Sequence, residues 1–247
     1  MNMKLKNVLY SMMAAVTFAA GSASGSTVAG NGGIFSTILS APIEASVTAA
    51  SKEVYRGAAR GDNFVAAKVD TTVDLFGVAL DAGLTFKDND ATDLETVFSA
   101  KATKALGDYD VSVVFNYYTE GSDVVGDQTS EVGFGVAKGV GPVDVSLTQF
   151  LALDGDNEGY GEVGVDWTPA INLVNKEWYV KGAVGYVLEE AELTHAQVTV
   201  STDFELPWEL TATPFVTAVL SLADEAGGVW ADADSEVVVG VRVGRSF

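Results

Sequence analysis

The C-terminal stretch Ser235-Glu236-Val237-Val238-Val239-Gly240-Val241-Arg242-Val243-Gly244-Arg245-Ser246-Phe247 carries an apolar residue at nearly every second position. Side chains of a β-strand point alternately to its two faces, so the stretch predicts a strand with one apolar and one polar face. Arg245 departs from the pattern, because it falls on the apolar face. Its stem can lie along apolar surface while its charged end extends toward water.

The same alternation recurs from Ile43 onward, with turn residues at roughly every 10 to 15 positions. Helices would place apolar residues three or four positions apart, so this spacing favours a meander of antiparallel strands. The segments amount to about twelve strands, an even number, as in bacterial membrane barrels. We therefore predict an all-β fold, a single antiparallel transmembrane β-barrel of about 12 strands. A soluble secreted β-sandwich is the competing fold.

The final strand ends the chain on an aromatic residue, Phe247, and in this it resembles the last strand of bacterial outer-membrane β-barrels. The resemblance implies a location in the bacterial cell outer membrane, with both termini periplasmic and the wall in contact with outer-membrane lipids. It also implies that the barrel-assembly machinery recognises Phe247.

The N-terminus has the composition of a secretion signal. Lys4 and Lys6 precede an apolar run at 8–20 and a small-residue stretch at 21–23, after which a signal peptidase could cut. The run is too short for a membrane-spanning helix, which needs about 20 apolar residues. We predict three regions along the chain: a signal peptide at 1–23, a flexible N-terminal segment at 24–42, and the barrel at 43–247.

Composition excludes several functions. The net charge of −20 opposes nucleic-acid binding, because phosphate contacts need lysine and arginine. The absence of cysteine excludes a disulfide framework and a thiolate metal site. The sequence has no P-loop, no HExxH and no dinucleotide-binding glycine motif, and its acidic loop clusters lack the full calcium-loop spacing. We expect neither a cofactor nor a metal.

The predicted connections between strands alternate in character. Short ones fall around Gly77, Gly107-Asp108, 139–142 and Leu206-Pro207. Longer acidic ones fall at 57–62, 87–93, 120–129, 154–158, 189–192 and 223–234, and a longer turn at 168–176 is the exception. Short turns on one rim and long loops on the other are typical of the periplasmic and extracellular ends of outer-membrane barrels.

Aromatic residues gather near the predicted strand ends, as they do at membrane interfaces. One set is expected at the periplasmic interface: Phe76, Tyr109, Trp167, Trp178, Phe204, Trp208 and Phe247. The other set is expected at the outer interface: Tyr55, Phe64, Phe86, Tyr117, Tyr118, Tyr160 and Tyr186.

The first predicted hairpin contains Tyr55-Arg56-Gly57-Ala58-Ala59-Arg60-Gly61-Asp62-Asn63. Its spacing of Tyr-Arg-Gly and Asp-Asn resembles the first hairpin of the TorF family of proteobacterial outer-membrane proteins. That family usually has Ile-Ser-Gln after the glycine and Pro-Ala shortly after the asparagine, where this chain has 58–60 and 65–66. The resemblance covers about ten residues and implies a small outer-membrane barrel, without implying an activity.

The charges of this hairpin suggest two roles. Arg56 falls on the inward parity with Lys52, and Asp62 could return across the loop to pair with Arg56 or Arg60. Such a pair would close the loop. The alternative is a ligand-binding or constriction element at a pore mouth.

Charged residues occupy many positions that alternate with the apolar ones. Inside a closed barrel such charges must be solvated or paired, because burying them alone costs several kcal/mol each. Together with Arg56, Asp62 and Lys52, these candidate pore-mouth and luminal residues are Asp70, Asp74, Asp81, Glu95, Glu131, Asp144, Glu162 and Lys181.

Two arrangements of the lumen would satisfy these charges. A narrow watery channel with an acidic excess would favour cations, whereas a lumen filled by a salt-bridged network would not conduct. Inward glycines and alanines leave free volume and favour the passage, although they also permit strand curvature: Gly83, Gly133, Gly135, Ala137, Gly164, Ala183, Gly185 and Gly240.

The sequence therefore favours a narrow porin-like channel for small solutes or cations over a non-conducting structural or surface-interaction barrel. An enzyme at the barrel rim is a third reading and the weakest. The single histidine, His195, has no adjacent serine nucleophile, and an enzymatic role would require a carboxylate beside it. We predict that His195 is a structural residue near the rim and that no residue of the chain is catalytic.

Overall fold

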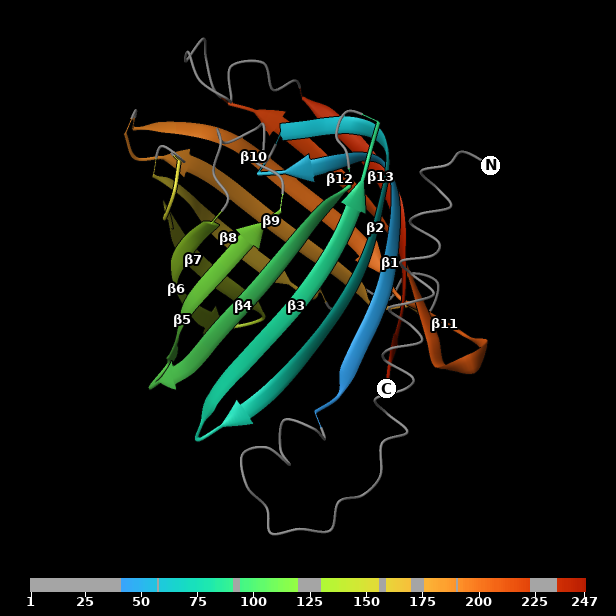
Figure 1. The fold of residues 1–247 in the computed structure, drawn as a ribbon, viewed down its shortest axis with the longest axis horizontal. Coiled ribbons are helices and arrows are strands. Elements are labelled where there is room, and N and C mark those ends of the chain that lie inside the picture. The colour runs from blue at the N-terminus through green and yellow to red at the C-terminus, as the bar shows by residue number, and fades with distance from the viewer. Residues whose placement is uncertain are drawn as a thin grey trace.

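A computed structural model describes residues 41–56, 58–90, 94–119, 130–155, 159–169, 176–189, 191–222 and 235–247 (Figure 1). The predicted signal peptide and nearly all of the predicted N-terminal segment lie outside these residues. The strands are β1 (Ile43–Tyr55), β2 (Ala58–Leu75), β3 (Val78–Asp88), β4 (Glu95–Leu106), β5 (Tyr109–Tyr118), β6 (Ser130–Val140), β7 (Val143–Ala152), β8 (Tyr160–Trp167), β9 (Trp178–Val187), β10 (Glu192–Thr202), β11 (Phe204–Leu206), β12 (Leu210–Ser221) and β13 (Glu236–Ser246).

The strands close into a barrel. Each long strand pairs antiparallel with the next, and the ring is completed where β10 pairs with β12 and β13 pairs with β1. The three-residue β11 pairs only with β12. Within the described residues twelve long strands therefore form the wall, which confirms the predicted antiparallel barrel and excludes the two-sheet sandwich.

The two ends of the barrel differ. The turn end carries the tight turns β2–β3, β4–β5 and β6–β7, together with the start of β1 and the C-terminus, where the Phe247 amide donates to the Ile43 carbonyl at 2.8 Å. Both central residues of the first turn, Phe76 and Gly77, have positive φ, as two-residue hairpin turns require. The end of β8, the start of β9 and the β11 segment that precedes β12 also lie at the turn end. The loop end carries the connections β1–β2, β3–β4, β5–β6, β7–β8, β9–β10 and β12–β13, and most residues of the acidic loops predicted there lie outside the described residues.

The first predicted loop is wrong. Residues 58–62 belong to β2, so β1 and β2 form one long hairpin whose last register pair is Tyr55 with Ala58. Lys87 likewise belongs to β3 and not to the following connection.

The outer and inner faces of the wall follow the predicted alternation. Apolar side chains on the outside are largely exposed, for example Leu84, Phe98, Val113, Phe134, Leu147, Val198, Val216 and Val239. Polar side chains between them are buried in the interior, among them Ser112, Glu131, Thr213 and Thr217. This arrangement is the reverse of a water-soluble protein and matches a wall that is apolar outside and polar inside. No helix in the described part of the chain is long and apolar enough to cross a membrane.

Candidate functional site

The tip of the β1–β2 hairpin crosses the lumen at the loop end. In Figure 1 the upper ends of β1 and β2 bend across the mouth of the barrel. A register shift at Lys52/Glu53 inserts an extra residue into β2, where Gly61 has a φ of 49°, and such a bulge bends a strand. Arg56 at the tip contacts side chains of β6, β7 and β8. These strands form the wall opposite β1, since β7 is the sixth strand around the ring in either direction.

Arg56 is held by an ion pair and three aromatic rings. Its guanidinium pairs with the carboxylate of Glu131, and both side chains are buried, at 7% and 1% exposure. The guanidinium carbon lies 4.4 Å from the ring centroid of Tyr160, 5.1 Å from that of Tyr55 and 5.2 Å from that of Phe150. Desolvated cation–π contacts of this kind add to the ion pair. The hairpin tip is therefore fastened to the far wall.

Glu131 is the centre of a hydrogen-bond network. Its Oε1 accepts from Asn116 Nδ2 at 2.9 Å and from the Tyr118 hydroxyl at 2.9 Å, while Oε2 accepts from Arg56. The Tyr55 hydroxyl donates to the Tyr118 oxygen at 3.0 Å, and the two rings meet edge to face. A buried carboxylate is tolerated when a cation and several donors compensate its lost hydration, as here.

The network continues through Tyr160 to His195. The Tyr160 hydroxyl donates to Glu162 at 3.1 Å, and the His195 ring lies nearly parallel to the Tyr160 ring at 6.4 Å. His195 Nδ1 lies 3.0 Å from Thr194 Oγ1, while Nε2 is buried without a hydrogen-bond partner among the described residues. The carboxylate that an enzymatic role would require is not in hydrogen-bond contact with His195 in the described part of the chain. The ring packs as part of the luminal filling.

A second buried cluster lies beside the hairpin. Lys87 Nζ is 2.8 Å from Glu53 Oε1 and 3.3 Å from Glu95 Oε2, and Asn89 donates to Glu53 at 2.7 Å. The three charged side chains are each at most 10% exposed. The same Lys87 ammonium lies 5.1 Å from the centroid of the Tyr55 ring, which joins this cluster to the Arg56 network. Together the two clusters fill the lumen at the loop end.

The inward glycines make room for rings and leave less free volume than the sequence indicates. A Cβ added at Gly133 would lie 2.8 Å from the Phe150 ring, and one at Gly185 would lie 2.5 Å from His195 Nδ1. Bulky inward side chains on one strand thus occupy the space that glycine leaves on its neighbour. At Gly133 and Gly185 the prediction that inward glycines leave free volume is wrong.

We expect Gly185→Ala to destabilise the barrel by about 1–3 kcal/mol, the usual cost of overpacking an interior. The added methyl group would overlap the His195 ring, which is 1% exposed and has no space into which to retreat. Gly182→Ala is the matched control on the same strand, because its nearest atom outside the neighbouring residues would lie 3.8 Å away. Thermal unfolding in detergent, followed by heat-modifiable gel migration, measures the difference, and equal losses in the two variants would contradict tight packing around His195.

The turn end of the lumen is open by comparison. A polar vestibule of about 700 Å³ is lined there by residues of β1, β2, β12 and β13 and by Asp203 between β10 and β11, with Phe64, Lys68, Asp70 and Arg242 among the strand residues. Lys68 and Asp70 form an ion pair, and Asp203 accepts a hydrogen bond from Thr213. The lumen thus consists of a filled half and a solvated half.

The predicted site residues divide between these regions. Arg56, Glu131 and Glu162 meet in the hairpin network, Glu95 lies in the Lys87 cluster and Asp70 in the vestibule. The expected pairing of Asp62 with Arg56 is wrong, because Arg56 reaches Glu131; Asp62 lies 3.9 Å from Lys52, which itself pairs with Glu236.

The other predicted residues stay apart from the hairpin network. Asp74 accepts from the Gly77 amide at 3.1 Å and so closes the β2–β3 turn. Asp81 accepts from Thr72 at 2.7 Å, and Asp144 stands opposite Gly139 beside the β6–β7 turn. Lys181 pairs with Asp166 at 3.1 Å on the solvated inner wall. Each of these contacts lies within one pair of neighbouring strands.

Sequence reasoning missed the aromatic part of the site. Tyr118 and Tyr160, expected at the outer interface, are instead buried inside the lumen at 4% and 1% exposure. The Tyr55 side chain points inward with them. Phe150, which also contacts Arg56, is in neither of the two predicted sets of interface aromatics. The alternation along each strand does indicate an inward position for both tyrosines. Tyr118 lies two positions from Asn116, and Tyr160 lies two positions from Glu162, so each pair shares a face.

No protein-family model matches the sequence, and no curated protein matches it. Among solved structures the chain is similar to the KdgM porin in complex with disordered oligogalacturonate (TM-score 0.45, 8% identity, 81% of this chain and 97% of that chain). It is also similar to an outer membrane channel from Pseudomonas putida F1 (0.48, 10%, 84% and 95%) and to outer membrane phospholipase A from Escherichia coli (0.48, 12%, 83% and 89%). These likenesses concern the barrel fold and carry no information on activity.

Proposed function

We propose that the protein is a bacterial outer-membrane barrel that works as a gated, narrow channel for small solutes or cations. The exposed apolar wall supports membrane insertion, since such a surface would be costly in water. With the turn end periplasmic, both ends of the barrel segment face the periplasm, as the resemblance of the last strand and of the first hairpin implies. We expect Phe247 to serve the assembly machinery.

The observation that carries the gate is the way the hairpin tip is held. Its contacts with the far wall are made through side chains, chiefly the Arg56–Glu131 pair and the surrounding rings. The neighbouring long strands of the wall are instead joined by backbone ladders in the described residues, with register shifts at Lys52/Glu53 and Leu193/His195. The tip can therefore leave the lumen without breaking the barrel. Behind it the vestibule already holds about 700 Å³ of polar space.

The charge of the chain supports a preference for cations. Carboxylates such as Asp70, Asp81 and Asp203 line the solvated half, and the net charge of −20 adds to the negative potential. A second candidate function is a non-conducting barrel. The paired charges that fill the loop end favour it, because they block that cross-section in this closed arrangement.

Conductance in planar bilayers separates the two functions. We expect folded wild-type barrel to open rarely, and a variant in which 53–61 is replaced by Asn-Gly to conduct several-fold more, with a reversal potential that favours cations. The replacement suits a two-residue turn because Lys52 and Asp62 are register partners. Phe76→Asn is the matched control, since it changes the turn at the opposite end and leaves the hairpin tip in place.

Folding of each variant is checked by heat-modifiable migration after outer-membrane fractionation. A shortened hairpin that folds and still does not conduct would support the non-conducting barrel. If the Phe76→Asn control conducts as well as the shortened hairpin, then conduction does not depend on removing the hairpin tip.

A further inference from the structure

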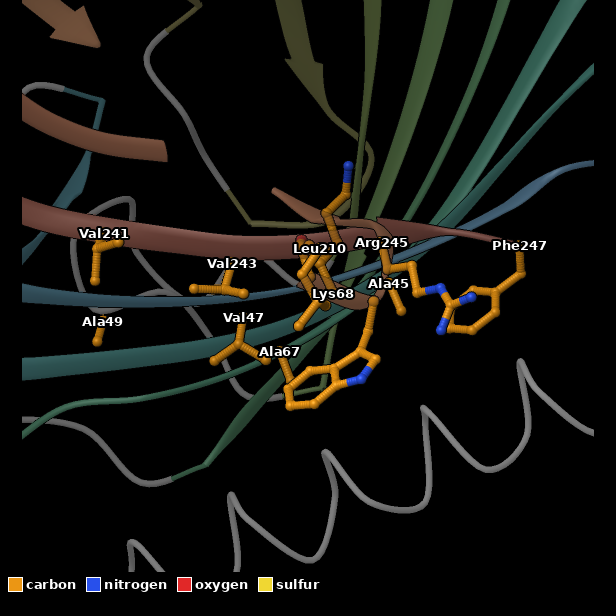
Figure 2. Close-up of a pocket in the computed structure, with 13 residues that line it drawn as sticks. Ala45, Val47, Ala49, Ala67, Lys68, Leu210, Val241, Val243, Arg245 and Phe247 are labelled. Carbon is orange, nitrogen blue, oxygen red and sulfur yellow. The ribbon is translucent and has the colours of Figure 1, made fainter. Parts of the chain in front are cut away.

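An apolar groove lies on the outer wall at the turn end, where the first and last strands meet. It has a volume of about 540 Å³, within the range of ligand-binding clefts, and Figure 2 shows its lining side chains from β1, β2 and β13. The small residues Ala45, Ala49 and Ala67 line it together with Val47, Val241 and Val243. Alanines leave room that the Leu and Phe side chains elsewhere on the outer wall would occupy.

A strained segment supplies one side of the groove. Trp208 and Glu209 follow β11 with φ values of 64° and 59°, a left-handed conformation that is rare for residues other than glycine. Trp208 is 81% exposed and lines the groove together with Leu210. Strain of this kind costs of order 1–3 kcal/mol per residue and is retained where a site needs it. Tryptophan is also the residue typical of membrane interfaces.

A cation closes the end of the groove nearest the C-terminus. Arg245 Nη2 lies 2.6 Å from Glu209 Oε2, and the guanidinium lies 5.0 Å from the Phe247 ring centroid. The Arg245 side chain is nevertheless 37% exposed, and Glu209 engages only one of its nitrogens. Because a guanidinium carries five N–H donors, it can donate to a further acceptor. The groove is thus an apolar channel with the Arg245 guanidinium at one end, and Glu209 occupies only part of that guanidinium's hydrogen-bonding capacity.

We propose that this groove binds one anionic phospholipid of the periplasmic leaflet, with an acyl chain over Ala45, Ala49 and Ala67 and the phosphate on Arg245. The groove complements an apolar chain that ends in a negatively charged group, because its lining is mostly apolar and the partly exposed Arg245 lies at one end. Basic side chains at the membrane surface bind such headgroups. The proposal needs the barrel to lie in a membrane, but it does not need the barrel to conduct.

Native mass spectrometry of the detergent-purified barrel tests the proposal, with phosphatidylglycerol and phosphatidylethanolamine added in turn. We expect the wild-type barrel to retain one phosphatidylglycerol molecule in preference to phosphatidylethanolamine. Arg245→Gln should weaken its retention about tenfold or more, because a hydrogen bond to a charged group is lost. Ala67→Leu should do the same by filling part of the groove, where Ala67 is 2% exposed.

Lys138→Gln is the matched control. Lys138 is also a cation at the turn end, 4.6 Å from the Tyr109 ring centroid and 3.8 Å from Asp108, but it lines no described groove. Equal retention of the two lipids by wild type, or equal loss in Lys138→Gln and Arg245→Gln, would overturn the proposal. So would a rise in lipid retention after deletion of residues 24–40, because the chain's own N-terminal segment would then be the occupant.

Discussion

Replacing Arg56 by alanine is expected to lower the free energy of unfolding by about 3–5 kcal/mol, the usual cost of leaving one partner of a buried ion pair alone. The Glu131 side chain is 1% exposed and would be left in the interior without its cation. Loss of the three cation–π contacts acts in the same direction. Urea unfolding of the barrel in lipid vesicles, followed by tryptophan fluorescence, measures the change.

The double variant Arg56→Ala/Glu131→Gln should recover part of that loss. Glutamine keeps an acceptor for Asn116 and Tyr118 but carries no charge, so the unpaired carboxylate is removed. Arg56→Lys should fall between wild type and Arg56→Ala, because lysine keeps the charge without the planar fork. If Arg56→Ala and the double variant lose equal stability, the pair is solvated and the hairpin tip is not fastened by it.

Alternation along the sequence predicts the strands and the face of each residue, while the turn and loop lengths and the C-terminal Phe247 favour a barrel over a sandwich. Period-two patterning assigns each residue to one face, and the register pairs place Val113 beside Phe134 and Leu84 beside Phe98 on the outside, as the pattern requires. Because the whole pattern inverts with a shift of one residue, agreement along the twelve long strands excludes registers displaced by an odd number of residues. The positions of the short turns follow from the same pattern, because the alternation is interrupted at each of them.

The hairpin network could not be predicted, because it breaks alternation. Lys52 contacts Glu236 while its neighbour Glu53 contacts Lys87, so two consecutive side chains both make interior contacts. Strict parity excludes Glu53 from the lumen, and only the bulge at Gly61 brings it there. A bulge of this kind has no reliable sequence signal beyond a glycine. The pairing of Arg56 with Glu131 also depends on the bend and joins residues 75 positions apart.

The glycines were misread for a related reason. From sequence, glycine on the inward parity indicates free volume. Whether that volume stays empty depends on the residue opposite it in the neighbouring strand, as with Phe150 beside Gly133. Register supplies this information, and it follows only after the strands have been paired.

Lys87→Met is expected to cost at least as much as Arg56→Ala, about 3–5 kcal/mol, because the lysine lies between two buried carboxylates. Adding Glu53→Gln should restore part of the stability, since Asn89 can still donate to the glutamine oxygen. Lys181→Met is the matched control. Its partner Asp166 is at 3.1 Å, but the two side chains are 70% and 56% exposed, and such pairs contribute about 1 kcal/mol or less.

The contrast between the two lysines tests the division of the lumen itself. Urea unfolding should give a large loss for Lys87→Met and a small one for Lys181→Met, because only the first lysine lies where water is excluded. Equal small losses would mean that water reaches the Lys87 cluster. The loop end would then be a wet passage around the hairpin tip, and conduction would not need the tip to move.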